Sequence, residues 1–141
     1  MKNKKLLIIA LTFISFILSA CAETDIPEEV KYSYDLVDDF FLYKSNDDIT
    51  FVATKTDGSN DEDSKIILEN VSKIAWNENF ILAEQIERIQ LGKEEKEVYW
   101  IINPNNKKIY GPMEYKEFNE ERKVLKVDQS LELKNPDGYL K

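Results

Sequence analysis

Short segments of β-forming residues, separated by turn-forming residues, dominate this chain between residues 30 and 110. The clearest segment is the first, in which Val30, Tyr32, Tyr34 and Leu36 alternate with polar residues. A period of two is typical of a strand with one buried face. Similar β-rich runs occupy residues 40–43, 49–54, 66–70, 71–76, 80–83, 98–102 and 107–110. The pattern predicts an antiparallel β-meander, in which strands adjacent in sequence pair with each other.

Turn-forming sequences separate these runs. Ser45-Asn46-Asp47-Asp48 has the composition of a hairpin turn, and Asn77-Glu78-Asn79 carries two asparagines that tolerate left-handed conformations. Asn103-Pro104-Asn105-Asn106 places proline where a type I turn prefers it. Residues 84–97 are mostly polar, which predicts a fraying strand and a loop, with a short helix as the alternative.

The period changes after Gly111-Pro112, which we expect to end the last strand of the meander. Met113, Tyr115 and Phe118 fall within reach of one helical face, and Pro112 suits a first helical turn. One helix is therefore predicted at about 113–122, and the predicted fold class is α+β, an antiparallel β-meander sheet with one late helix. We further expect a closing strand at 124–127, a short strand at 131–133 and a turn at 135–138.

The first twenty residues have the composition of a secretory signal. Lys2, Lys4 and Lys5 precede an apolar run, residues 6–20, that contains no charge. As a helix this run would span roughly 22 Å, which is short of the roughly 30 Å hydrocarbon core of a bilayer. The segment predicts a cleaved signal peptide.

Cys21, the only cysteine of the chain, directly follows the apolar run. Leu18-Ser19-Ala20-Cys21 resembles the lipobox of bacterial lipoproteins, in which the cysteine thiol receives a diacylglyceryl group and the signal is cut just before it. The resemblance implies lipid attachment at Cys21 and a place on the extracytoplasmic face of the cell membrane. Two acyl chains would make that attachment stable. The alternative is a plain secretory signal or an uncleaved anchor, with Cys21 a bystander.

Removal of residues 1–20 leaves 121 residues, enough for one domain with one hydrophobic core. We expect an acidic tether at 21–29 and a single α+β domain at 30–141. Three of the nineteen basic residues and none of the twenty-seven acidic ones precede Cys21, so the remaining chain has a formal charge of −11. Such a surface repels phosphate backbones, which argues against nucleic-acid binding.

An acidic segment, residues 55–65, has no large apolar side chain to anchor it and predicts an exposed loop. Calcium binding between Asp57 and Asp63 is the alternative, because calcium prefers clustered carboxylate and amide oxygens. The EF-hand spacing fails, however, since its sixth position is Glu62 rather than glycine and its twelfth is Leu68 rather than glutamate. We therefore predict no metal site and no cofactor.

Several classes of catalysis are excluded by composition. The chain has no histidine and no second cysteine, so Ser-His and Cys-His triads and zinc sites of cysteine and histidine are absent. No Ser-x-x-Lys arrangement and no glycine-rich phosphate loop occurs. A carboxylate pair of the glycosidase type remains, with Glu78, Glu84, Glu114 and Glu117 as nominal candidates. We predict no catalytic residue.

Large aromatic side chains favour a binding role, because such rings commonly anchor ligands and protein partners. The candidate binding surface consists of Trp76, Tyr99, Trp100, Tyr110 and Tyr115. The alternative is that most of these rings are core. A contiguous exposed aromatic surface would favour a binding module, whereas two buried carboxylates with raised pKa values would favour a hydrolase.

The lipobox, together with the blocks at 71–77 and from 99–103 through 110–112, is similar to a family of small Gram-positive lipoproteins of unknown function. The resemblance implies no activity and carries over a role only for Cys21. The sequence thus predicts a lipid-anchored module that binds or scaffolds an envelope protein or glycan. The alternatives are a carboxylate-dependent glycan hydrolase and an immunity-type protein whose acidity steers it to a basic secreted toxin.

Overall fold

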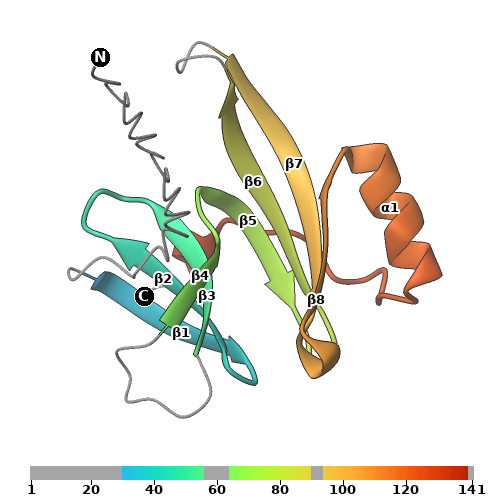
Figure 1. Cartoon of the computed structure of the whole chain (residues 1–141), viewed down its shortest axis with the longest axis horizontal. Helices are drawn as coiled ribbons and strands as arrows, with labels where there is room; N and C mark the ends of the chain where they lie inside the picture. The colour runs from blue at the N-terminus through green and yellow to red at the C-terminus, as the bar shows by residue number, and fades with distance from the viewer. Residues whose placement is uncertain (1–29, 56–63, 90–93, 140–141) are drawn as a thin grey trace, which may run out of the picture.

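The computed structural model describes residues 30–55, 64–89 and 94–139. These residues form eight strands, one α-helix and two short 3-10 helices (Figure 1). In chain order they are β1 (Val30–Val37), β2 (Phe40–Ser45), β3 (Thr50–Lys55), β4 (Ser64–Leu68), β5 (Val71–Trp76), β6 (Ile81–Ile89), β7 (Glu94–Asn103), η1 (Pro104–Asn106), β8 (Lys108–Met113), α1 (Tyr115–Val124) and η2 (Pro136–Gly138).

The strands form two antiparallel four-stranded sheets, ordered β1-β2-β3-β4 and β5-β6-β7-β8. Each sheet is a meander, so the predicted α+β class with antiparallel pairing and one late helix is confirmed. The expected single sheet is divided, because the chain passes from one sheet to the other between β4 and β5 (Figure 1). Only Glu69 and Asn70 lie between these strands, and Asn70 has a φ of 54°. Asparagine is one of the few residue types that tolerate this left-handed conformation.

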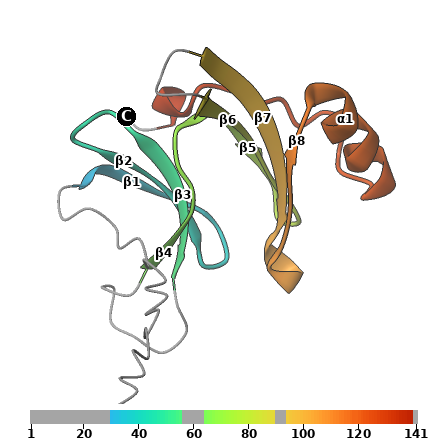
Figure 2. The same ribbon diagram turned by 45° about the horizontal axis from the view of Figure 1, so that its top comes forward.

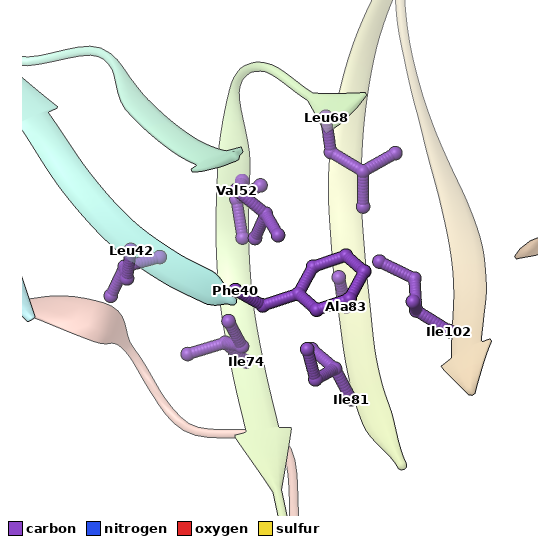
Figure 3. Close-up of a cluster of buried hydrophobic side chains, with 9 residues drawn as sticks. Phe40, Leu42, Val52, Leu68, Ile74, Ile81, Ala83 and Ile102 are labelled. Atoms are coloured by element: carbon purple, nitrogen blue, oxygen red, sulfur yellow. The ribbon is translucent and has the colours of Figure 1, made fainter. Parts of the chain in front are cut away.

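The two sheets pack face to face through one cluster of buried apolar side chains. Figure 3 labels eight of the nine members of this inter-sheet cluster. Phe40, Leu42, Val52 and Leu68 come from the first sheet, and Ile74, Ile81, Ala83 and Ile102 come from the second. Burial of one large aliphatic side chain contributes about 1.5–3 kcal/mol. Because both sheets contribute side chains to this cluster, neither sheet can bury its inner face without the other.

Helix α1 covers the opposite face of the second sheet (Figure 2). Phe118 of α1 is buried and packs in a second cluster with Leu82, Ile101 and Met113. The order of layers is therefore sheet, sheet, helix, with both faces of the second sheet covered.

The outer face of the first sheet carries a third buried cluster. Phe41, Tyr43, Phe51 and Ala53 form it, and the rings of Tyr43 and Phe51 are stacked with centroids 4.7 Å apart. Burial raises the pKa of Tyr43 to about 12. Strands β2 and β3 are thus apolar on both faces, as the unbroken apolar runs in their sequences suggest.

Strand β1 is confirmed, but its apolar face is only partly buried. Tyr32 and Tyr34 remain 43% and 40% exposed. Because β1 is an edge strand, it lies at the margin of the inter-sheet cluster. The ring of Tyr34 instead contacts Trp76 and Tyr139 at centroid distances of 5.6 and 6.3 Å.

The predicted fraying between residues 84 and 97 is wrong. Strand β6 continues to Ile89 and β7 begins at Glu94, and the two strands pair without interruption from Ile81↔Ile102 to Ile89↔Glu94. Opposite charges face each other across this part of the hairpin: Glu87 lies opposite Lys96, and Arg88 lies opposite Glu95. Cross-strand pairs of this kind stabilise a polar two-stranded ribbon. A composition that resembles a loop is therefore compatible with regular strands.

Gly111-Pro112 does not end the last strand as predicted, since β8 continues to Met113. Proline is tolerated there because β8 is an edge strand, where a missing N–H removes no ladder hydrogen bond. The helix consequently begins at Tyr115 and ends at Val124, two residues later than predicted.

The C-terminal segment also differs from the prediction. The prediction of a closing strand at 124–127 is wrong, because these residues form the end of α1 and the turn that follows it. In place of a strand at 131–133, one isolated bridge joins Ile74 and Lys134. The turn at 135–138 is confirmed and contains η2.

Gly111 provides a test of the packing of β8. Its φ is 131°, and an added Cβ would lie 2.7 Å from both Trp100 Cε3 and the Tyr99 carbonyl oxygen. We expect Gly111→Ala to lower the free energy of unfolding by about 2–4 kcal/mol, because the ring and the backbone must both shift. Gly138→Ala is the matched control, since nothing lies within 4 Å of its added Cβ. Urea denaturation measures both variants, and equal losses would contradict this account.

Candidate functional site

The five aromatic residues of the candidate surface are divided between the two faces of the second sheet. Trp76 and Trp100 pack against the inter-sheet cluster, whereas Tyr99 and Tyr110 lie with the cluster beneath α1. Tyr115 is 62% exposed, and its ring lies 5.3 Å from that of Tyr99. Successive residues of a strand face opposite sides of the sheet, so adjacent Tyr99 and Trp100 are separated. The five rings do not form one contiguous surface.

Both tryptophans hold parts of the fold together. The Trp76 ring contacts Tyr139 at 4.6 Å as well as Tyr34, so it joins the edge strand β1 to the C-terminal segment. Trp100 Nε1 donates a hydrogen bond of 2.7 Å to Gln85 Oε1, and the Trp100 ring lies against Gly111. These contacts account for the partial burial of both rings.

Of the four candidate carboxylates, only Glu84 is buried. Glu78, Glu114 and Glu117 are exposed. Glu84 is 4% exposed and lies on the α1-facing side of β6, where two side chains of β5 reach it. Ser72 Oγ donates to Glu84 Oε1 at 2.8 Å, and Lys73 Nζ donates to Glu84 Oε2 at 2.9 Å.

The environment of Glu84 favours its ionised form. Burial alone would raise the pKa of Glu84, but hydrogen bonds from Lys73 and Ser72 and the charge of Lys73 outweigh it. The pKa therefore lies below its ordinary value. A glycosidase acid needs the opposite shift, so that it keeps its proton at neutral pH. Glu84 instead holds β5 and β6 together as a paired carboxylate.

A polar cleft of about 500 Å³ lies at one end of the second sheet. Ligand-binding pockets commonly measure 300–1,000 Å³. Three connections form this cleft: the β5–β6 turn, the β7–β8 turn and the segment after α1. Its lining consists of Asn77, Asn79, Phe80, Asn103, Asn105, Lys126 and Asp128.

Hydrogen bonds within the two turns fix the asparagines of the cleft. Asn77 Oδ1 accepts from the backbone N–H groups of Asn79 and Phe80, both at 2.9 Å. Asn103 Oδ1 accepts from the backbone N–H of Asn106 at 3.4 Å. The predicted asparagine turn at 77–79 is thus confirmed, but Asn77 serves it as an acceptor and not through a left-handed backbone. Among the described residues, the Nδ2 donors of Asn77 and Asn103 have no hydrogen-bond partner.

Arg122 holds the third wall of the cleft in place. Its side chain is buried against the ring of Phe118, and Nη2 donates to the carbonyl oxygens of Asp128 and Leu131, both at 3.0 Å. Asp128 Oδ1 accepts from the backbone N–H and the hydroxyl of Ser130. These hydrogen bonds lower the pKa of Asp128, so its carboxylate is ionised at neutral pH.

Lys126 follows α1 in a left-handed conformation, with a φ of 56°. The N–H of Val127 donates to the carbonyl of Arg122 at 2.9 Å, and that of Lys126 donates to Lys123 at 3.2 Å. This pair of hydrogen bonds is the Schellman motif, which usually places glycine where this chain has Lys126. The helix end therefore directs a lysine side chain into the lining of the cleft.

The two turns that line the cleft were predicted from the sequence, but the cleft itself was not. In an antiparallel sheet, the turns that follow β5 and β7 emerge at the same end, so asparagines in both are brought together. That recurrence is the signal that could have located the site. Lys126 and Asp128 could not have been added, because their place depends on how α1 packs.

The acidic segment at 57–63, where calcium binding was the alternative, lies outside the described residues. Among the residues described, no group of three or more acidic or cysteine side chains is placed to hold a metal ion.

Comparison with known proteins places the chain in a family. The model described as "Protein of unknown function (DUF3997)" matches residues 37–137. The chain belongs to the DUF3997 family. No curated protein and no solved structure matches it. In this DUF3997 protein, the matched region extends from the end of β1 to η2 and includes every residue of the cleft.

The lowered pKa of Glu84 predicts how stability depends on pH. The unfolded chain takes up this proton at its ordinary pKa, about 4.3, before the folded protein does. The stabilisation by Glu84 is therefore complete above that value and is lost as pH falls through the lower folded pKa. We expect Glu84→Gln to cost about 1–2 kcal/mol at pH 7 and to flatten the loss of stability below about pH 4.3.

Glu114→Gln is the matched control for this variant. Glu114 is exposed and pairs with Lys96 at 3.2 Å, so its loss should change stability by less than about 0.5 kcal/mol. Urea unfolding between pH 3 and 7 measures all three proteins. If Glu84→Gln follows the acid limb of the unaltered protein, the account of Glu84 is wrong.

Proposed function

We propose that this DUF3997 protein is a lipid-anchored, non-catalytic binding module on the extracytoplasmic face of a Gram-positive cell membrane. The observation that carries the proposal is Leu18-Ser19-Ala20-Cys21 at the end of an uncharged apolar run. Cleavage before Cys21 and attachment of a diacylglyceryl group to its thiol would hold the domain at the membrane surface.

Two features support binding over catalysis. The chain has no histidine, and Glu84, the buried carboxylate in the described part of the chain, is paired with Lys73 and has a lowered pKa. The polar cleft, in contrast, presents amide groups and one charge of each sign, which suit recognition of a ligand without bond cleavage.

The charge of the chain suits a domain held beside the membrane but not lying on it. From Cys21 onward the formal charge is −11, which an anionic lipid surface repels. Nine residues separate the start of Cys21 from β1, and extended they reach about 30 Å. No helix among the described residues is long and apolar enough to cross a membrane. In this proposal the lipid is the attachment, and the tether sets the distance.

Lipid attachment is tested by intact-mass analysis of the membrane fraction. We expect the unaltered protein to begin at Cys21 and to carry the mass of a diacylglyceryl group, because the cysteine thiol is the acceptor. The Cys21→Ala variant should lack that mass, and no membrane-anchored mature form of it should be detected. Ala22→Ser, one residue away, should be lipidated normally. An unmodified or uncleaved unaltered chain would refute the anchor.

A further inference from the structure

We propose that the polar cleft at the end of the second sheet binds a saccharide. The inference rests on the proposed function, since it takes the domain to be a binding module, and it adds the class of ligand: an uncharged, hydroxyl-rich sugar chain of the envelope. The cleft is built from three connections that are distant in sequence, 77–80, 103–105 and 126–128.

The polar groups of the cleft match the chemistry of sugars. A sugar hydroxyl both donates and accepts a hydrogen bond, and a side-chain amide does the same. Asn77 and Asn103 contribute Nδ2 donors without a partner among the described residues, and the ionised Asp128 contributes an acceptor. Asn79 and Asn105 add a donor and an acceptor each.

Phe80 supplies the apolar part of the site. Its side chain is half-buried and packs against the cluster beneath α1, and it also lines the cleft. A pyranose ring has a polar rim and apolar C–H faces, so it needs an apolar surface beside polar partners. Phe80 is the single aromatic residue in a lining that is otherwise polar.

Electrostatics favour an uncharged ligand over a phosphate or a strongly charged peptide. Lys126 and Asp128 give the cleft one positive and one negative charge. A polyanion would also be repelled by the acidic chain as a whole. An apolar peptide side chain would find too little apolar lining.

Asn77, Asn103 and Asp128 are held in place before a ligand arrives. Asn77 and Asn103 are fixed by hydrogen bonds to their own turns, and Arg122 fixes the carbonyl of Asp128. Groups that are already ordered lose little conformational entropy on binding, which raises affinity. Pre-organisation distinguishes this cleft from a chance gap between mobile surface loops.

Lys126 gives the sharpest argument for a ligand. Glycine would adopt its left-handed conformation without strain, so a lysine there lowers the stability of the fold. The backbone hydrogen bonds of the Schellman motif would form with glycine as well, and the ammonium group of Lys126 forms no ion pair with a described residue. A ligand oxygen in the cleft would be its partner.

The experiment titrates the full chain, purified in detergent and labelled with ¹⁵N, with two neutral tetrasaccharides, tetra-N-acetylchitotetraose and cellotetraose. Side-chain NH₂ signals of asparagine are resolved in such spectra. We expect saturable shifts of the Asn77 and Asn103 signals with at least one of the two sugars. Absence of saturable shifts with both would overturn the proposal.

Two lysine variants separate the role of the side chain from that of the fold. Lys126→Gly should bind about tenfold more weakly, through loss of a charged hydrogen bond, yet melt at a higher temperature because the strain is relieved. Lys107→Gly is the matched control, since Lys107 also has a left-handed φ of 56° but its ammonium lies 3.9 Å from Asp39 and outside the lining. It should bind as the unaltered chain does. Equal affinities of Lys126→Gly and Lys107→Gly would overturn the assignment of Lys126 to the site.

The result is independent of lipid attachment. A lipidated chain that binds neither sugar would overturn this inference and leave the anchor standing. A chain that binds the sugars but carries no lipid would support the saccharide site and refute the anchor.

Discussion

The inter-sheet cluster is the contact on which the rest of this structure depends. Two residues, Glu69 and Asn70, carry the chain from β4 into β5, so the two meanders must face each other at once. Leu42 and Val52 on one side and Ile74 and Ile81 on the other are fully buried by that arrangement. The single cysteine allows no disulfide within the chain, so packing of this kind must supply the stability.

Coverage of the second sheet on both faces decides where a ligand can be recognised. In the C-terminal half of β7, Ile102 faces the first sheet while Tyr99 and Ile101 face α1, so neither face of that half is open. Polar recognition is left to the edges and ends of the strands, where loops need not be buried. The cleft occurs at such an end. Arg122 joins the layers to it, because the same side chain packs on Phe118 of α1 and holds the carbonyl of Asp128.

Local patterns predicted much of the fold, and long-range packing explains what they missed. The alternation in β1 and the turn at 45–48 depend on neighbouring residues, and both were found. The polar half of the β6–β7 hairpin was missed because its stability comes from partners across the strands, such as Arg88 and Glu95. The division into two sheets could not be predicted, because the sequence Glu69-Asn70 does not differ from that of an ordinary turn between two paired strands. The cleft was missed for the same reason, since Lys126 reaches the asparagine turns only through the packing of α1.

The place of the cleft relative to the tether bears on how an anchored domain would work. Strand β1 begins on the far side of the molecule from the turn that joins β7 and β8 (Figures 1 and 2). A chain attached to the membrane through Cys21 would enter the domain at β1, so the cleft would project away from the lipid surface. The repulsion between an anionic bilayer and a chain of formal charge −11 acts in the same direction, because it disfavours orientations that lay the acidic domain against the lipid. The proposed attachment site, the charge of the chain and the place of the cleft are therefore mutually consistent with recognition of a ligand outside the membrane.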